Sequence, residues 1–273
     1  MNKKIIKRLL IGEFSLKRLM ISVLFIYAAI GSYGYFLSDW MIFKPQPDSY
    51  QDSGDILKLK SGKGNLISAI YLPNPQATYT ILYSHGNAED LGDIRPVLNR
   101  IRQMGFSLFA YDYQGYGTSE GKPSENNAYA DINAAYAYLT QKLGKSPERI
   151  IIYGRSVGGG PAVELATREP IAGLVLESAF TSVFRVITQI PIYPVDKFNN
   201  IQKIKQVDAP VLVIHGTEDE VIAFWHGEKL FAAANEPKTF FPVQGAMHNN
   251  VMGVAGDRYA ETLREFAAAI EAE

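Results

Sequence analysis

The feature that most constrains this 273-residue chain is the pentapeptide Gly154-Arg155-Ser156-Val157-Gly158 together with its flanks. An apolar, β-branched run, IIIY (150–153), enters it, and a helical pattern, GGPAVELA (159–166), leaves it. This is the strand–turn–helix context in which a glycine-flanked serine is presented as a nucleophile. Side chains at the two glycine positions would clash where the strand and the helix converge. The sequence therefore predicts a sharp turn that exposes Ser156.

After residue 78, apolar strand patterns alternate with helical patterns. This alternation predicts an α/β fold with a doubly wound, mostly parallel sheet, and an opening hairpin (strands 55–60 and 65–72) on its antiparallel edge. The segment 181–207 reads as irregular and predicts a small cap at most. The further expected strands are 78–84, 107–111, 150–153, 171–177, 211–215 and 238–242, and the expected helices are 91–104, 125–143 and 259–270.

The N-terminal part of the chain predicts a membrane-spanning helix. Residues 19–38 carry no formal charge, and about 20 mostly apolar residues suffice to cross the hydrocarbon core of a bilayer. The excess of basic residues before this segment predicts a single-pass anchor with a cytoplasmic N-terminus and the main domain on the non-cytoplasmic side. Those residues are Lys3, Lys4, Lys7, Arg8, Lys17 and Arg18.

This assignment divides the chain into an N-terminal anchor region, residues 1–43, and a main domain, residues 44–273, joined at the proline-containing linker 43–47. Two alternatives remain for the apolar segment. Small residues at positions 29 and 31 would also suit a cleaved signal peptide, and a buried core helix is the other possibility.

Composition excludes several classes of site. A formal net charge of −1 and the lack of a basic patch in the main domain give no reason to expect a nucleic-acid partner. The chain contains no cysteine, which excludes disulfides, thiolate zinc sites and a cysteine nucleophile.

A serine nucleophile needs a histidine base, and in this architecture the order along the chain is serine, acid, histidine. Of the four histidines, His85 precedes Ser156 and His215 ends an apolar strand. His226 lies at a helix start, where we expect either a surface position or a staple contact with the helix. His248 follows the last strand, in GAMHN (245–249), and has the position that the order predicts for the base.

The acid is expected just after strand 211–215, where Glu218, Asp219 and Glu220 follow one another. Asp219 is preferred, since its short side chain would hold a histidine tautomer with the least freedom. The two neighbouring glutamates remain alternatives, and a solvated acidic turn is the non-catalytic interpretation of all three.

The oxyanion formed during acyl transfer requires two backbone N–H donors. We expect one from Val157, directly after the nucleophile, and the other from Asn87, in the loop after strand 78–84. Arg155 is expected either to meet an anionic substrate group or to pair with a nearby carboxylate. The glycine-rich loop 112–119 lacks the spacing of a dinucleotide site and is expected to shape the rim of the pocket.

Six blocks in a fixed order resemble the α/β-hydrolase superfamily, and within it the single-domain serine hydrolases that include membrane-associated protein depalmitoylases. They are SHGNAEDLG (84–92), YDYQGYGTSEGKPSE (111–125), YGRSVGGGPAVELA (153–166), LESAFTS (176–182), VLVIHGTEDEVI (211–222) and GAMHN (245–249). Carried over position by position, the resemblance implies Ser156 as nucleophile, Asp219 as acid and His248 as base. The N-terminus departs from the family pattern: those depalmitoylases attach to the cytoplasmic face through acylated cysteines, and here an apolar segment takes that place.

These observations lead us to expect a membrane-anchored serine hydrolase that cleaves small or lipid-like carboxylic esters or thioesters through an acyl-enzyme, with no metal or organic cofactor. A serine peptidase on the same fold and a catalytically inactive, membrane-tethered binding protein are the alternatives. Apolar residues of the cap would either line an acyl pocket or pack on the sheet. They are Val186, Ile187, Ile190, Ile192 and Val195.

Overall fold

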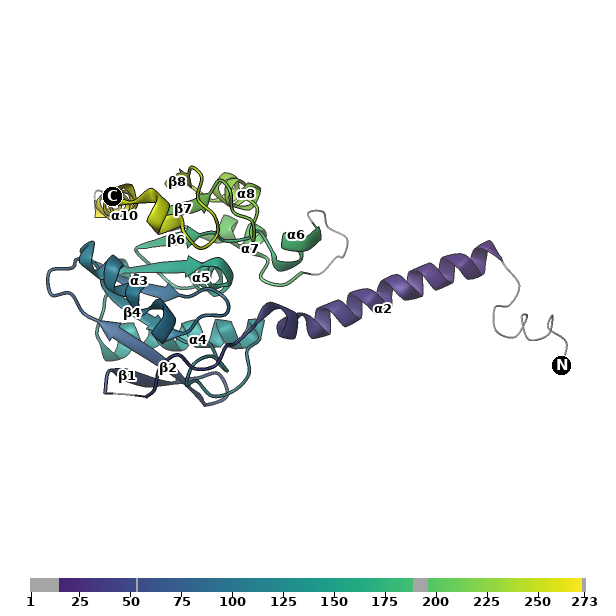
Figure 1. The fold of residues 1–273 in the computed structure, drawn as a ribbon, viewed down its shortest axis with the longest axis horizontal. Coiled ribbons are helices and arrows are strands. Elements are labelled where there is room, and N and C mark those ends of the chain that lie inside the picture. Colours follow the sequence, from purple (N-terminus) through teal and green to yellow (C-terminus); the bar gives the residue numbers. More distant parts are fainter. Residues whose placement is uncertain (1–14, 53, 189–195, 272–273) are drawn as a thin grey trace. The chain divides into compact units, whose positions relative to one another are not determined.

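The computed structural model describes residues 15–52, 54–188 and 196–271. The chain separates between Ser38 and Asp39 into two units, which are described one at a time (Figure 1). Among the described residues, α2 (Leu16–Ile42) is the one helix that is long and apolar enough to cross a membrane. Its large apolar side chains are exposed, which argues against the core-helix interpretation of this segment.

The second unit is built on a sheet that has eight strands in the described part of the chain, in the order β1-β2-β4-β3-β5-β6-β7-β8. The β1–β2 hairpin pairs antiparallel to β4, and all pairs from β4 to β8 are parallel. The predicted mostly parallel sheet with a hairpin at its edge is confirmed. The strands are β1 (Ile56–Ser61), β2 (Asn65–Leu72), β3 (Thr80–Ser84), β4 (Ser107–Tyr111), β5 (Ile150–Arg155), β6 (Gly173–Glu177), β7 (Val211–Gly216) and β8 (Lys238–Val243).

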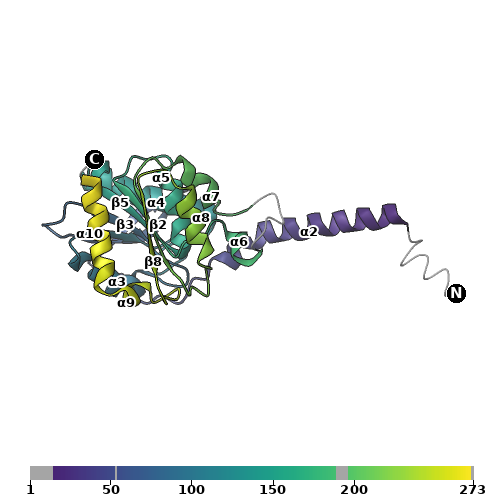
Figure 2. The same ribbon diagram turned by 90° about the horizontal axis from the view of Figure 1, so that it is seen from above.

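Helices cover both faces of this sheet, as Figure 2 shows with the sheet seen edge-on. One face carries α3 (Leu91–Gln103), α9 (Val251–Ala255) and α10 (Asp257–Glu271), and the other carries α4 (Glu125–Ala137), α5 (Gly159–Ala166) and α8 (Trp225–Ala233). Two clusters of buried apolar side chains fill the layers on either side. The central strands are buried on both faces, which explains why they read as continuous apolar runs rather than as alternating patterns.

Two expectations about local structure need correction. The helix expected over 125–143 changes at Tyr138 into a π-helical turn, Tyr138–Lys142. The segment 181–207 is not irregular where it is described: it forms α6 (Val183–Thr188), α7 (Asn200–Lys203) and the 3₁₀ turn Ile204–Gln206. Such helices of one or two turns are too short for a periodic pattern to reveal.

Candidate active site

The turn after β5 has the sharp form that the sequence predicts. Ser156 has a backbone φ of +52°, a left-handed conformation that residues other than glycine rarely adopt. The chain continues directly into α5. A Cβ atom at Gly154 would lie 2.6 Å from the carbonyl oxygen of Gly158. One at Gly158 would collide with the backbone of Ser84 at the end of β3. The two glycines therefore allow the strand, the helix and the loop after β3 to meet at Ser156.

Three residues that the sequence order selected lie in one hydrogen-bonded chain. His248 Nε2 is 3.0 Å from Ser156 Oγ, and His248 Nδ1 is 2.8 Å from Asp219 Oδ2. They follow β5, β8 and β7, whose carboxyl ends meet at the same edge of the sheet. All three are more than nine-tenths buried. The arrangement has the donor and acceptor order in which an imidazole takes a proton from a hydroxyl while a carboxylate orients it.

Asp219 is held as an ionised acceptor. Its Oδ1 accepts hydrogen bonds from the backbone N–H groups of Val221 (3.0 Å) and Ile222 (2.7 Å). Burial acts to raise the pKa of Asp219, but hydrogen bonds from His215 and His248 outweigh it and hold the pKa well below its usual range. His215 Nε2 lies 3.4 Å from Asp219 Oδ2, a contact that sequence reasoning missed.

The two glutamates beside Asp219 take other positions. Glu218 and Glu220 are exposed, whereas Asp219 is buried. The Glu220 carboxylate accepts a hydrogen bond of 3.1 Å from the backbone N–H of His248. Of the three candidate acids, Asp219 is therefore the one whose side chain is hydrogen-bonded to the imidazole. Glu220 binds the backbone of the loop that carries His248.

The two residues expected to supply oxyanion donors lie on the elements that converge at Ser156. Val157 is buried in the short 3₁₀ turn Ser156–Gly158. Asn87 lies in the loop after β3, and the backbone of that loop packs against Gly158. Within the described residues, no acceptor is found for the backbone N–H of Asn87.

Arg155 pairs with carboxylates, one of the two roles expected for it. Its guanidinium lies 2.9 Å from Glu89 and 3.4 Å from Glu177, and it donates a 2.7 Å hydrogen bond to the side chain of Asn249, the neighbour of the histidine. Glu89 in turn accepts the backbone N–H of Gly86 at 2.6 Å. One partly buried cation thus links the loop after β3, the strand before the serine and the loop of His248.

The other histidines are buried and hydrogen-bonded. His85 Nδ1 lies 2.7 Å from the carbonyl oxygen of Gly86 and His215 Nε2 lies 2.8 Å from that of Ile222, so His215 packs at its strand end as expected. Of the two positions expected for His226, the surface position is wrong: His226 is 1% exposed, and its Nδ1 accepts the backbone N–H of Thr181 at 3.1 Å. A single apolar neighbour in the sequence gives no signal of such burial.

The apolar residues of the cap differ in burial. Val186 is partly buried against the core, whereas Ile187 is 75% exposed. The remaining residues named for an acyl pocket, at positions 190, 192 and 195, lie outside the described residues.

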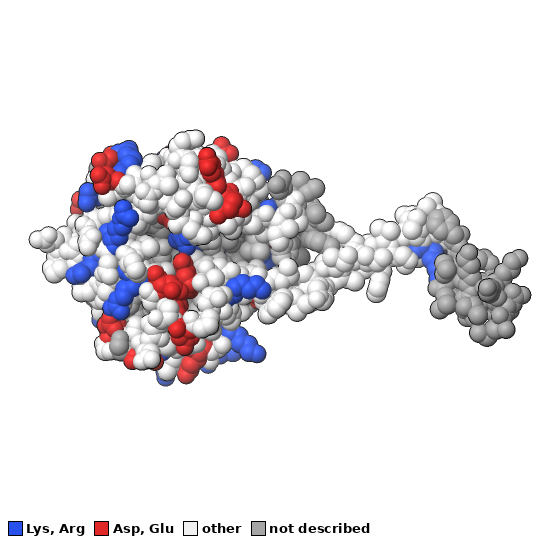
Figure 3. All heavy atoms as spheres, in the orientation of Figure 1, with Lys and Arg blue, Asp and Glu red and all other residues white. Residues whose placement is uncertain are grey.

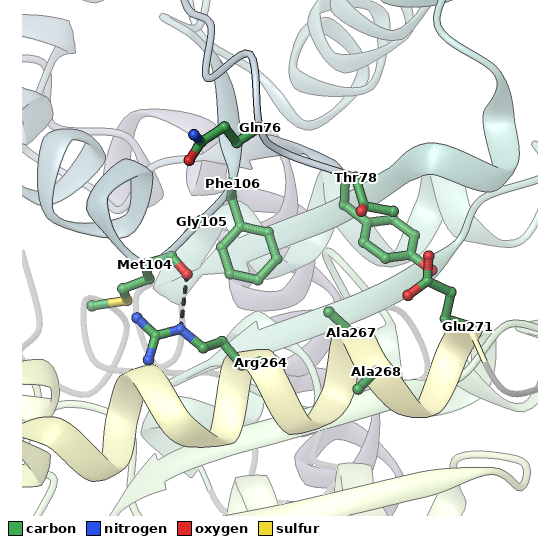
Figure 4. A pocket seen from close by; sticks show the side chains of 10 residues that line it. Gln76, Thr78, Met104, Gly105, Phe106, Arg264, Ala267, Ala268 and Glu271 are labelled. Atoms are coloured by element: carbon green, nitrogen blue, oxygen red, sulfur yellow. Dashed lines mark hydrogen bonds between the residues drawn. The ribbon is translucent and has the colours of Figure 1, made fainter.

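A separate cavity of about 210 Å³ lies at the opposite edge of the sheet, before the starts of β3 and β4 and against α10 (Figure 4). Arg264 spans it and donates to the carbonyl oxygen of Met104 at 3.0 Å. Since the amino ends of the strands face it, this cavity is remote from Ser156. Figure 3 shows acidic and basic side chains interspersed over one face of the main domain, as the small net charge leads one to expect.

Comparison with known proteins identifies the family of this chain. A family model described as serine aminopeptidase, S33, matches residues 75–201. The alpha/beta hydrolase domain-containing protein 17B of Xenopus laevis is 41% identical over 235 residues, which cover 85% of this chain and 80% of that protein, and the human protein of that name gives the same figures. This chain belongs to that family of α/β-hydrolases.

The solved structures extend the likeness in fold. The esterase Pf2001 of Pyrococcus furiosus superimposes with a TM-score of 0.71 at 15% identity, covering 84% of this chain and 98% of the esterase. At that sequence identity the match shows only that the two proteins share a fold. The family membership and the matching family model make this protein a serine hydrolase of the α/β-hydrolase fold.

Proposed function

We propose that this α/β-hydrolase cleaves acyl esters or thioesters with Ser156 as nucleophile, His248 as general base and acid, and Asp219 as the carboxylate that orients it. The observation that carries the proposal is the position of the His248 imidazole, 3.0 Å from the serine hydroxyl on one side and 2.8 Å from the carboxylate on the other. The depressed pKa of Asp219 supports it as well, because an ionised carboxylate stabilises the imidazolium formed during the reaction.

In the first half of the reaction, the Oγ of Ser156 attacks the acyl carbonyl carbon while its proton passes to His248 Nε2. The N–H groups of Val157 and Asn87 hold the negative charge on the carbonyl oxygen. The bond to the alcohol or thiol then breaks, and that group leaves with the proton from His248. In the second half, His248 takes a proton from water, the resulting hydroxide attacks the acyl-enzyme, and the acid is released as Ser156 regains its proton.

The substrate class proposed is a small or lipid-like acyl ester or thioester. The resemblance to the depalmitoylase group favours long acyl chains. Serine–histidine–aspartate chemistry supplies both the nucleophile and the proton transfers, so the proposal requires no metal or organic cofactor. The serine peptidase description of the matching family model makes amide cleavage the second candidate.

We also propose that α2 anchors the enzyme in a membrane. Its length and apolar surface support a span, and the basic residues before it favour a cytoplasmic N-terminus with the catalytic domain, residues 44–273, on the other side. A cleaved signal peptide is the alternative. Protease protection of a C-terminal tag in sealed vesicles, together with the mass of the mature chain, decides between these topologies.

The enzymatic proposal is tested with p-nitrophenyl esters, acyl thioesters and acyl amides of matched chain length, hydrolysed by the full chain in detergent. We expect turnover of esters or thioesters that is lost in Ser156→Ala. Turnover of amides alone would favour the peptidase. No turnover of any of the three by folded protein would leave the inactive binding protein as the better account.

A further inference from the structure

The loop proposed to provide an oxyanion donor is hydrogen-bonded to the segment 42–44, at the end of α2 and just beyond it. The side-chain amide of Asn87 makes two hydrogen bonds to that segment: its Oδ1 accepts the backbone N–H of Lys44 at 2.9 Å, and its Nδ2 donates to the carbonyl oxygen of Ile42 at 2.5 Å. Ile42 is the last residue of α2. A single side chain in the loop thus holds the chain on both sides of Phe43.

Tyr116 completes this connection. Its hydroxyl donates to Asn87 Oδ1 at 2.6 Å and accepts from the backbone N–H of Lys44 at 3.0 Å. The Asn87 oxygen also accepts the backbone N–H of Ala88 at 2.9 Å, and Ala88 has φ of +59°, a left-handed conformation. Because the amide oxygen meets only donors and the amide nitrogen a carbonyl, the side chain has one orientation here.

Phe43 fixes the segment by packing. Its side chain is 3% exposed, and its ring centre lies 6.3 Å from that of Tyr113, 6.4 Å from that of Tyr116 and 6.0 Å from that of Phe198. Phe198 in turn fills the space over Gly160, in the first turn of α5 after the serine. The segment is therefore wedged between the loop after β4 and the cap.

A second polar tie lies at the end of α2. Asp39 accepts a hydrogen bond of 3.0 Å from Lys197 Nζ and one of 3.3 Å from the backbone N–H of Glu125. Residues 39–44 are thus held by a carboxylate, an aromatic ring and backbone groups in turn. A mere linker between an anchor and a domain needs none of these contacts.

We propose that Asn87, Tyr116 and the backbone of residues 42–44 form an oxyanion clamp, which positions the Asn87 N–H toward the developing oxyanion. This inference rests on the proposed function, because it assumes that Asn87 supplies an oxyanion donor. Three hydrogen bonds of the clamp involve the side chain of Asn87. The backbone N–H of Asn87 has no acceptor among the described residues. The chain leaving the proposed anchor is thereby part of the catalytic apparatus, and Asn87, Tyr116 and Lys44 act as positioning residues.

Loosening the clamp should act on the transition state. An oxyanion donor binds the tetrahedral state more strongly than the ground state, and a misplacement of about 1 Å can cost up to about 100-fold in rate. We expect a loss of about ten-fold in kcat for each broken clamp contact, with KM changed less than about two-fold.

The experiment uses the full chain in detergent with a p-nitrophenyl ester. Tyr116→Phe removes the hydroxyl and keeps the ring, and Lys44→Pro removes the backbone donor. The matched controls are Tyr136→Phe, whose buried hydroxyl donates to the carbonyl oxygen of Pro170, and Gln46→Pro, two residues beyond Lys44. Each variant is also titrated with a trifluoromethyl ketone, which forms a tetrahedral oxyanion adduct with the serine.

The clamp is supported if Tyr116→Phe and Lys44→Pro lower kcat and ketone affinity by the same factor while both controls match the unmodified chain. Unchanged kcat in both variants, with an active parent, overturns the clamp and leaves the hydrolase mechanism standing. A loss of kcat that follows a lowered melting temperature, with ketone affinity retained, also overturns it. Failure of the parent itself to hydrolyse the ester is a failure of the proposed function.

Discussion

Two of the buried histidine–aspartate contacts at the carboxyl edge of the sheet, His248–Asp219 and His85–Asp112, differ in what the other ring nitrogen faces. In one, His248 lies 2.8 Å from Asp219 and its other ring nitrogen faces Ser156. In the other, His85 at the end of β3 lies 3.4 Å from Asp112 after β4, and its other ring nitrogen faces the carbonyl oxygen of Gly86. Both pairs consist of a histidine and an aspartate. They differ in the third group, which is the hydroxyl of Ser156 in the first pair and the carbonyl oxygen of Gly86 in the second.

In the His85–Asp112 pair, further protein groups donate hydrogen bonds to the carboxylate. The Asp112 carboxylate also accepts from the backbone N–H of Leu91 at 2.9 Å and from the hydroxyl of Tyr50. Burial would lower the pKa of His85, but the hydrogen bond and charge of Asp112 outweigh it and raise the pKa. His85 Nδ1 is thus hydrogen-bonded to the backbone, and Nε2 faces a buried carboxylate rather than a hydroxyl. Under the proposed mechanism, a histidine–aspartate pair acts as a base only where a reactive hydroxyl faces the second ring nitrogen.

The strongest test of the difference between the two pairs replaces each histidine in turn. His248→Ala should lower kcat by about 10⁶-fold, as expected for the base of a serine triad. Its melting temperature should change by less than about 4 °C, which corresponds to about 1 kcal/mol for a domain of this size. His85→Ala should instead lower the melting temperature more and keep kcat per folded molecule within about ten-fold. Steady-state kinetics with thermal unfolding measures both. Equal kinetic losses in the two variants would erase the distinction.

Replacing the carboxylates tests the same contrast at a smaller scale. Asp219→Asn should lower kcat by about 10⁴-fold, because the amide favours the wrong imidazole tautomer. Asp112→Asn should cost about 1–3 kcal/mol in the free energy of unfolding through lost buried hydrogen bonds and leave the chemistry in place. Urea unfolding beside ester turnover separates the two outcomes. A fully active Asp219→Asn would contradict the assignment of the acid.

Arg155 connects the two regions, because it contacts Glu89 near His85 and Asn249 beside His248. Arg155→Lys keeps the charge but loses the planar fork that binds several acceptors at once. We expect kcat to fall by about ten-fold, since displacing either loop misaligns the reacting groups. An ester kinetic assay of this variant, with Arg149→Lys on the surface as the control, measures the effect. Unchanged kcat would mean that the loops hold their positions without the guanidinium.

The smallest expected effect concerns a third histidine. Burial, followed by the charges of His215 and Lys229, lowers the pKa of His226 from 6.5 to about 4. Between these values the unfolded chain binds the proton and the folded chain does not. The stability linked to His226 is therefore full above about pH 6.5 and is lost as the pH falls toward 4. His226→Asn keeps an acceptor for Thr181 and should flatten the fall in melting temperature over this range. An unchanged slope would assign the acid sensitivity to other groups.

The sequence was sufficient where the determinants are local. The strands from β3 to β8 and the turn at Ser156 follow from neighbouring residues. Chain order selected Ser156, Asp219 and His248, and the fold brings these three side chains together. Other contacts depend on packing that no local pattern encodes. Asn87 meets Lys44 across 43 positions and Arg155 meets Glu89 across 66, and each pair is ordinary in composition. The burial of His226 was missed for the same reason, since Thr181 lies 45 positions away.

The central claim is that Ser156 is a nucleophile activated by His248. The most direct test treats the full chain in detergent with a fluorophosphonate, which labels activated serines, and locates the adduct by peptide mass spectrometry. The account predicts one adduct on Ser156 in the unmodified chain, and its loss in His248→Ala although Ser156 is still present. Labelling at another serine, or labelling of Ser156 at the same rate without His248, would contradict it.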